Sequence, residues 1–186
     1  MRIAIYGGSF NPPHVGHALV ASWARWTGRS DAVWLVPVYR HAFEDVHDKV
    51  LASFADRVGW CEAMARDLGP GCAVSEVESE LPTPSYSIDT LRFLAARFPK
   101  HEFRLVVGAD VLPHVHAWRD WEGIVAEFKP IVVGRGSYPP PVDQASLDFP
   151  DVSSSDIRRR HRLGQPVDHL LTSSVCAALD AWKGAW

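Results

Sequence analysis

Two histidines, His14 and His17, stand three residues apart at the end of the stretch GGSFNPPHVGH, residues 7–17. A short apolar run at residues 3–7 precedes this stretch, as in a buried strand, and ALVASWARW after it has a helical spacing of apolar residues. A strand that passes through a glycine turn into a helix presents unpaired backbone N–H groups, which bind anions such as phosphate. Both imidazoles would lie beside that anion, with exposed surface histidines or half of a metal site as the alternatives.

A second anion site is predicted near the C-terminus, in DVSSSDIRRRHRLG at residues 151–164. Three serines before Asp156 are typical of a helix N-cap, and their N–H and hydroxyl groups could bind phosphate. Arg158 is expected on the first turn of this helix, and the other three arginines of the segment are expected in solvent. The serines alone would also fit an ordinary capped surface helix. Two separate anion sites, one with histidines and one with arginine, match what a triphosphate requires.

Strand-like and helix-like segments alternate along the chain. Apolar runs predict strands at residues 3–7, 32–38, 72–77, 103–107 and 129–133, and helical spacing predicts helices after His17 and at residues 53–68 and 86–98. On the first helix, one face is expected to carry Ala18, Leu19, Ala21, Ser22 and Trp26. This rhythm predicts an α/β fold, a doubly wound parallel sheet with helices on both faces. Ligands would bind where the carboxyl ends of the first strand and of strand 103–107 meet.

The composition is that of one ordinary domain. The chain has 186 residues, 47% of them hydrophobic, and its net charge of −3 argues against general nucleic-acid binding, which needs a basic face. No apolar stretch approaches the ~20 residues of a membrane span and no signal peptide is evident, so we expect a single cytoplasmic domain over residues 1–186. Cys61, Cys72 and Cys176 are far apart and are expected to be buried free thiols.

Four segments resemble motifs of the α/β nucleotidyltransferase superfamily. Residues 14–17 (HVGH) are similar to its (T/H)xGH motif, and residues 152–158 (VSSSDIR) are similar to its ISSTxIR motif. Residues 79–94 (SELPTPSYSIDTLRFL) and 106–125 (VVGADVLPHVHAWRDWEGIV) resemble the SYTxxTL and GxDxL…W segments of bacterial nicotinate mononucleotide adenylyltransferases. The resemblance covers nearly the whole chain. It implies a Rossmann-like sheet and, in NAD biosynthesis, adenylyl transfer from ATP to nicotinate mononucleotide with Mg²⁺, giving deamido-NAD and pyrophosphate.

The resemblance also implies roles for individual residues. The residues expected to bind ATP are Gly8, Ser9, Phe10, His14 and His17 at the phosphates, Gly108 and Asp110 at the ribose, and Ser154, Ser155 and Arg158 at the departing pyrophosphate. The residues expected to bind the acceptor are Ser87, Trp118, Arg119 and Lys49, with Trp118 stacked on the pyridine ring. Because a nucleotide phosphate is already anionic, it needs no general base. His14, His17 and Arg158 would therefore act in catalysis by stabilising developing negative charge.

One segment departs from the family pattern. Residues 37–44 (PVYRHAFE) stand where nicotinate-type members carry a PNxxPPHK-like loop. Arg40 or His41 would then replace the usual cation at the acceptor phosphate, and Lys49 is the only lysine close by. The altered loop therefore affects the identity of the acceptor more than the adenylyl transfer itself.

A preference for nicotinate over nicotinamide requires hydrogen-bond donors directed at both carboxylate oxygens. Ser85 and Ser87 are expected to cap a helix that begins near Tyr86 and to leave N–H groups facing that carboxylate. The backbone N–H of Arg119 would offer a second hydrogen bond. The sequence therefore predicts nicotinate mononucleotide as the preferred acceptor.

The acceptor and the class of protein both have alternatives. Nicotinamide mononucleotide or phosphopantetheine could be the acceptor, and a non-catalytic nucleotide sensor would keep the same fold, although intact His14, His17 and Arg158 favour an enzyme. A metal-dependent hydrolase is a weaker alternative, because His114 and His116 supply two ligands at most and zinc sites need three or four. The sequence leaves a homo-oligomer open, and no nucleic-acid or membrane partner is expected.

Overall fold

Six strands form one parallel sheet in the computed structural model, which describes residues 1–40, 51–135, 138, 148–149 and 152–186. The strands are β1 (Arg2–Gly8), β2 (Ala32–Pro37), β3 (Cys72–Val74), β4 (Glu102–Gly108), β5 (Ile131–Arg135) and β6 (Asp148–Phe149). They lie in the order β3-β2-β1-β4-β5-β6, and each neighbouring pair is parallel. The predicted parallel sheet is confirmed, and β3 ends three residues earlier than expected.

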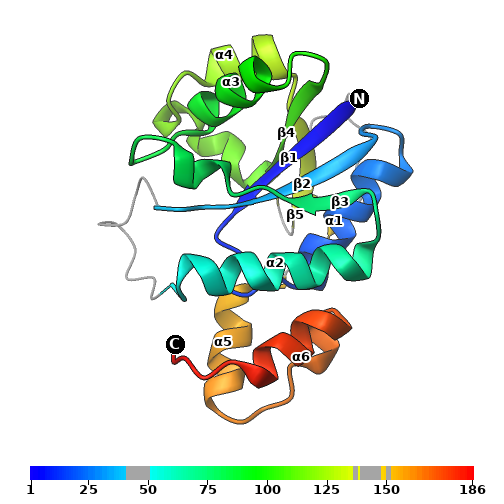
Figure 1. Cartoon of the computed structure of the whole chain (residues 1–186), viewed down its shortest axis with the longest axis vertical. Coiled ribbons are helices and arrows are strands. Elements are labelled where there is room, and N and C mark those ends of the chain that lie inside the picture. The colour runs from blue at the N-terminus through cyan, green and yellow to red at the C-terminus, as the bar shows by residue number, and fades with distance from the viewer. Residues whose placement is uncertain (41–50, 136–137, 139–147, 150–151) are drawn as a thin grey trace.

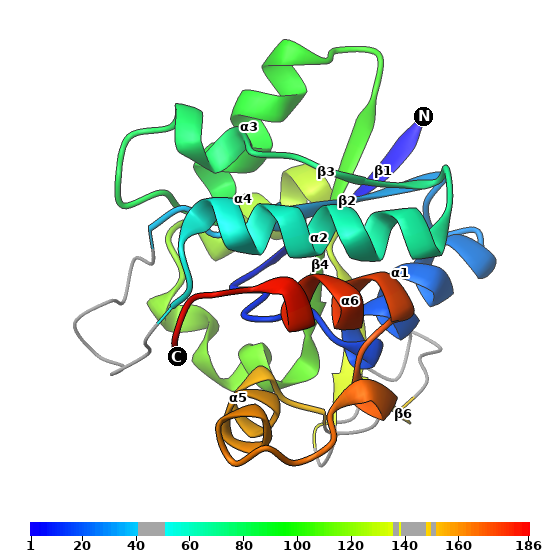
Figure 2. The same ribbon diagram turned by 60° about the horizontal axis from the view of Figure 1, so that its bottom comes forward.

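Helices cover both faces of the sheet. The α-helices are α1 (Val15–Trp26), α2 (Phe54–Leu68), α3 (Ser87–Arg97), α4 (Trp121–Phe128), α5 (Ser154–Arg162) and α6 (Ser173–Ala181), and the 3₁₀ helices are η2 (Val77–Glu80), η3 (Ala109–Ala117) and η4 (Asp168–Leu170). Figure 1 shows α3 and α4 on one side of the sheet and α2 on the other, with α5 and α6 beyond α2. In Figure 2, α6 runs along α2. No helix among the described residues is long and apolar enough to cross a bilayer.

The alternation of side chains along β1 divides the core into two layers. Ile3 and Ile5 point to the α3 and α4 side, where they pack in one cluster with Ile88. Ala4, between them, belongs to the cluster on the α1 and α2 side, which includes Trp60. Successive residues of a strand face opposite sides of a sheet, and each large apolar side chain buried this way contributes ~1.5–3 kcal/mol. A strand buried on both faces is therefore apolar throughout, as the sequence of β1 is.

The inward face of α1 differs from the expectation. Leu19 and Trp26 are 46% and 83% exposed, and Ser22 is exposed as well. The buried residues of this helix are Gly16, Ala18, Val20, Ala21, Trp23 and Ala24. Apolar residues occur almost all round α1, so their spacing predicts a helix but cannot say which side packs on the sheet. The helix was predicted correctly, and the face was wrong except at Ala18 and Ala21.

Successive strands are added to the sheet first on one side of β1 and then on the other. From β1 the chain passes first to β2 and β3 on one side and later to β4, β5 and β6 on the other. The carboxyl ends of β1 and β4 are therefore neighbours at a switch point, where α/β sheets bind their ligands. The expectation that these two ends meet is confirmed.

The three cysteines are free thiols at different depths. Cys61 and Cys72 are buried, whereas Cys176 is only half-buried. Burial raises the pKa of Cys72 to about 11. This thiol therefore stays protonated at neutral pH and is a structural, unreactive group.

Candidate active site

A cleft of about 390 Å³ opens at the carboxyl ends of β1 and β4. Its walls come from the loop after β1, the start of α1, the end of β4 with η3, and the start of α5. All ten residues predicted to bind ATP line it: Gly8, Ser9, Phe10, His14, His17, Gly108, Asp110, Ser154, Ser155 and Arg158. The fold thus brings the two predicted anion sites, more than a hundred residues apart in the chain, into one cavity.

The two histidines are linked at the start of α1. His14 is the N-cap residue, in extended conformation, and its backbone N–H donates to Nδ1 of His17 at 3.1 Å. Since Nδ1 of His17 accepts this bond, the neutral imidazole carries its proton on Nε2, which is then a donor for a ligand. The centroids of the two rings lie 3.8 Å apart, and His14 is 5% exposed. The pair is therefore rigid, and α1 directs its positive end to the same cavity.

Gly16 and Phe10 shape this part of the cleft. A Cβ on Gly16 would lie 3.1 Å from Nδ1 and Cε1 of His14, so the glycine makes room for that imidazole. The Phe10 side chain is 1% exposed and packs with ring centroids 4.9 Å from His17 and 5.7 Å from Tyr6. A buried ring of this kind supports His17, so a contact from Phe10 to a phosphate would have to come from its backbone.

The start of α5 is fastened to the loop after β1. Ser153 is the N-cap and accepts from the N–H of Asp156, so the predicted cap is confirmed. The Ser154 hydroxyl donates to the carbonyl of Pro12 at 2.9 Å. Arg158, on the second turn and not the first as expected, lines the cavity with Ser154. These contacts fix a second wall of the cavity, which is lined by Ser153, Ser154, Ser155 and Arg158.

The Arg158 guanidinium is held by neutral partners. Its Nη1 donates to the Asn11 carbonyl at 2.8 Å, and its Nη2 donates to the Ser155 hydroxyl at 3.1 Å. Arg159 and Arg160 instead pair with Asp156, outside the cavity. The charge of Arg158 is therefore still available to an anion, because its hydrogen-bond partners carry none.

Gly108 and Asp110 form the opposite side of the cleft. Gly108 is the last residue of β4, and Asp110 is the second residue of η3. A Cβ on Gly108 would stand 2.1 Å from Oδ1 of Asp110, so only glycine lets this carboxylate fold back over the strand end. Asp110 lines the cleft, and an ionised carboxylate accepts hydrogen bonds, as binding a ribose hydroxyl would require.

A second cavity of about 230 Å³ adjoins the first. The two cavities share lining residues Gly7, Gly8, Ser9, Val106 and Trp118. Three of the four predicted acceptor residues, Ser87, Trp118 and Arg119, line this second cavity, and Lys49 lies outside the described residues. Arg40 lines it as well, and it is described although most of its loop is not. The two cavities could hold two ligands that meet over Gly8 and Ser9.

The predicted capping of α3 by serines is wrong. Tyr86 is the N-cap residue and makes no side-chain hydrogen bond to the helix. The Ser85 hydroxyl donates to Glu78, and Ser87 is already the first residue of the helix. The N–H groups of the first turn are thus left without a side-chain cap in the described structure, which favours an anionic ligand there.

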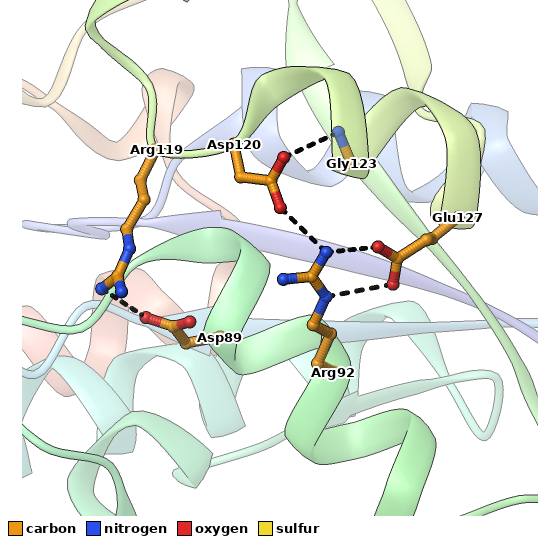
Figure 3. A network of polar contacts seen from close by, with 6 residues as sticks. All are labelled: Asp89, Arg92, Arg119, Asp120, Gly123 and Glu127. Carbon is orange, nitrogen blue, oxygen red and sulfur yellow. Dashed lines mark hydrogen bonds and ion pairs between the residues drawn. The ribbon is translucent and has the colours of Figure 1, made fainter.

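The Arg119 side chain forms an ion pair with α3. Its Nη1 lies 3.1 Å from Oδ2 of Asp89 (Figure 3). Its guanidinium also lies 5.0 Å from the Tyr86 ring centroid. Arg92 of α3 contacts Asp120 and Glu127 of the α4 region in the same network. These exposed ion pairs contribute little energy individually, but together they hold the Trp118 wall against α3.

Two buried charged residues of the site escaped the sequence analysis. Arg57 of α2 is 2% exposed, and its guanidinium donates to the carbonyls of Ser9 and Ala52, both at 3.1 Å. Glu78 of η2 is 8% exposed and lines the second cavity. Arg57 could have been found from the sequence, because it lies beside Val58 on the apolar face of α2, where a charged residue is unusual. The sequence carries no comparable signal for Glu78, which lies outside any regular pattern.

The alternative of a metal-dependent hydrolase finds no support in the geometry. His114 and His116 are exposed residues of η3, with ring centroids 6.4 Å apart. Among the residues that the structure describes, no three His, Cys, Asp or Glu side chains gather as metal ligands would.

Comparisons with known proteins agree with this geometry. The cytidylyltransferase-like family model matches residues 5–160. The probable nicotinate-nucleotide adenylyltransferases of Anaeromyxobacter sp. (strain K) and Exiguobacterium sibiricum are 42% and 35% identical to the chain, over 94% and 98% of it and 91% and 98% of the relatives. The fold matches that of Plasmodium falciparum nicotinic acid mononucleotide adenylyltransferase complexed with NaAD, with a TM-score of 0.74, 18% identity, and coverage of 96% and 94%. The chain therefore belongs to the cytidylyltransferase-like family and, within it, to the nicotinate-nucleotide adenylyltransferases.

Proposed function

We propose that this protein transfers the adenylyl group of ATP to nicotinate mononucleotide, giving deamido-NAD and pyrophosphate. The observation that carries the proposal is the pair of cavities that meet over Gly8 and Ser9. One cavity has histidine, arginine and helix N-terminal donors suited to a triphosphate, and the other has a helix start without a side-chain cap and an indole, which suit an anionic aromatic ring. The names of the relatives support the same pair of substrates.

The reaction needs positioning and positive charge more than proton transfer. A phosphate oxygen of the acceptor attacks the α-phosphorus of ATP, a new P–O bond forms, and the bond to the β-phosphate breaks with its electron pair leaving on pyrophosphate. His17, with its proton on Nε2, donates to the α-phosphate as charge develops, and Arg158 binds the departing β- and γ-phosphates. His14 orients His17 through the bond from its backbone N–H to Nδ1.

Magnesium belongs to the substrate side of this proposal. Mg²⁺ prefers oxygen ligands and is commonly bound through substrate phosphates with one or two carboxylates. The first cavity is here called the donor cleft, because ATP, the adenylyl donor, is proposed to bind there. Asp110 is the one carboxylate among the described residues that line it. Mg²⁺ would therefore be held mainly by the phosphates of ATP.

The proposed location of the protein is the cytoplasm, where ATP and mononucleotides occur.

Selection of nicotinate over nicotinamide depends on hydrogen-bond donors in the second cavity. The uncapped start of α3 at Ser87 and the backbone N–H of Arg119 would bind the two carboxylate oxygens, while Trp118 stacks on the ring. The Arg119 side chain, paired with Asp89, contributes less charge than a free arginine would. A carboxamide would turn an N–H toward one of these donors and leave it unpaired, which disfavours nicotinamide mononucleotide.

Pyrophosphate release with ATP and Mg²⁺ tests the proposal. We expect kcat/KM for nicotinate mononucleotide to exceed that for nicotinamide mononucleotide by on the order of 10³-fold, less than the ~10⁴–10⁵-fold of sites whose wrong substrate lacks the bonded group altogether, because the carboxamide keeps one oxygen. Equal values or a preference for the amide would contradict the acceptor and leave the adenylyl transfer standing. ATP binding without pyrophosphate release from either acceptor would contradict the transferase and favour a sensor.

A further inference from the structure

Glu78 is a buried carboxylate to which the proposed reaction gives no role. It lies in η2 and is 8% exposed. With Trp118 and Ser87 it lines the second cavity, here called the acceptor cavity because the mononucleotide is proposed to bind there. Burying a carboxylate is unfavourable unless fixed donors compensate it, so its partners indicate what it does.

One oxygen of Glu78 joins the two walls of the acceptor cavity. Oε2 accepts from the backbone N–H of Tyr39 at 3.1 Å and from the Ser85 hydroxyl at 2.9 Å. Tyr39 follows β2, next to Arg40, and Ser85 precedes the start of α3. Arg40 and Ser85 both line the cavity, so the carboxylate connects the segment after β2 with the segment that carries the α3 N-terminus.

The charge of Glu78 is compensated from within the protein. Burial raises the pKa of Glu78, and the bonds from Tyr39 and Ser85 and the charge of Arg57 act against this rise. Arg57 in turn donates to the carbonyl of Ser9, on the floor that the two cavities share. Hydrogen bonds to an ionised acceptor are roughly twice as strong as neutral ones, so this carboxylate is a firm cross-link between the segment after β2 and the segment before α3.

We propose that Glu78 is a positioning residue for the acceptor nucleotide. By holding the Tyr39–Arg40 segment against the segment Ser85–Ser87, it sets the separation of the two walls between which the mononucleotide binds. The inference rests on the proposed function, since it takes the second cavity as the acceptor site. Glu78 would act through these neighbouring segments, without contacting the reacting phosphates.

The test compares Glu78→Ala and Glu78→Gln with Glu80→Gln, a matched control in the same 3₁₀ helix whose side chain pairs with Arg97 outside the cavity. In Glu78→Ala we expect KM for nicotinate mononucleotide to rise by about tenfold or more, with KM for ATP changed by less than about twofold, because only the acceptor walls lose a cross-link. Glu78→Gln keeps an oxygen that can accept both bonds and should restore most of the acceptor affinity. Glu80→Gln should match the wild type in both constants.

Ser85→Ala provides a second route if Glu78→Ala does not fold, because it removes one of the two bonds while Glu78 stays in place. It should raise KM for the acceptor by about threefold, again without a change for ATP. A lowered melting temperature with unchanged KM for the acceptor, or equal increases of KM for both substrates, would overturn the proposal and assign Glu78 a purely structural role.

The same assay separates this inference from the proposed function. If the wild type uses nicotinamide mononucleotide instead, the proposed acceptor is wrong, while a raised KM for that mononucleotide in Glu78→Ala would still support the positioning role. If the wild type uses nicotinate mononucleotide and the variants match it, the function stands and the role of Glu78 falls. If the wild type neither turns over nor binds either mononucleotide in calorimetry, the acceptor site and the inference that rests on it are both refuted.

Discussion

Replacing Gly16 by alanine should separate the stability of this protein from its activity. Gly16 is the second residue of α1, and a Cβ there would lie 3.1 Å from Nδ1 and Cε1 of His14. Ordinary carbon contacts lie at ~3.5–4.0 Å, so the imidazole would have to shift by a few tenths of an ångström. It is 5% exposed with its centroid 3.8 Å from that of His17, and it therefore cannot move without moving its partner.

The expected effects of Gly16→Ala on the free energy of unfolding and on kcat/KM differ in size. Alanine is favoured over glycine in a helix by ~0.5–1 kcal/mol, which offsets most of the cost of a single tight contact. The free energy of unfolding should therefore change by less than about 1 kcal/mol. A misplacement of 1 Å in a catalytic group can cost about 10²-fold in rate, so a shift of a few tenths at both imidazoles should lower kcat/KM by about tenfold.

Gly59→Ala is the matched control. Gly59 lies inside α2, and a Cβ there would meet nothing within 4 Å. This variant should gain ~0.5–1 kcal/mol in urea unfolding and keep the wild-type kcat/KM. Steady-state pyrophosphate release and urea unfolding of both variants complete the experiment. Wild-type kcat/KM in a folded Gly16→Ala variant would refute the argument that the glycine positions the histidine pair.

Three further predictions concern catalysis, ATP binding and stability. His17→Ala should lower kcat by about 10²- to 10³-fold with the fold intact, as loss of a transition-state donor does, and near-normal turnover would exclude the histidine from catalysis. Arg158→Lys should raise KM for ATP by about fivefold and leave KM for the acceptor unchanged, because a lysine cannot keep both the Asn11 and Ser155 contacts. A raised KM for the mononucleotide with an unchanged KM for ATP would mean that Arg158 binds the acceptor instead. Burial acts to raise the pKa of Asp67, but hydrogen bonds from Ser174 at the start of α6 outweigh it and hold the pKa below its ordinary value. Asp67→Asn should therefore lose ~0.5–1 kcal/mol in urea unfolding at pH 7, and the loss should shrink below about pH 4 as the wild-type carboxylate protonates; a pH-independent difference would contradict the linkage.

Much of the donor cleft follows from the sequence because its parts are local. The apolar run of β1, the glycine turn and the spacing of His14 and His17 concern neighbouring residues, and so does the cap of α5 at Ser153. Local backbone preferences and side-chain periodicity decide such features before any tertiary contact forms. The alternation of strands and helices likewise predicted the parallel sheet and the meeting of β1 with β4.

The sequence by itself determined strands β1–β5, helices α1, α2, α3 and α5, the motifs and the family, while the tertiary structure added α4, α6 and β6 and decided which groups meet. That Arg158 reaches the carbonyl of Asn11 could not be predicted, because pairing over such a separation depends on how whole layers pack. The same holds for the inward face of α1 and for Ser85, whose hydroxyl was expected to cap α3 but donates to Glu78. A polar group takes whichever partner burial leaves within reach, and that choice is fixed only when the elements dock.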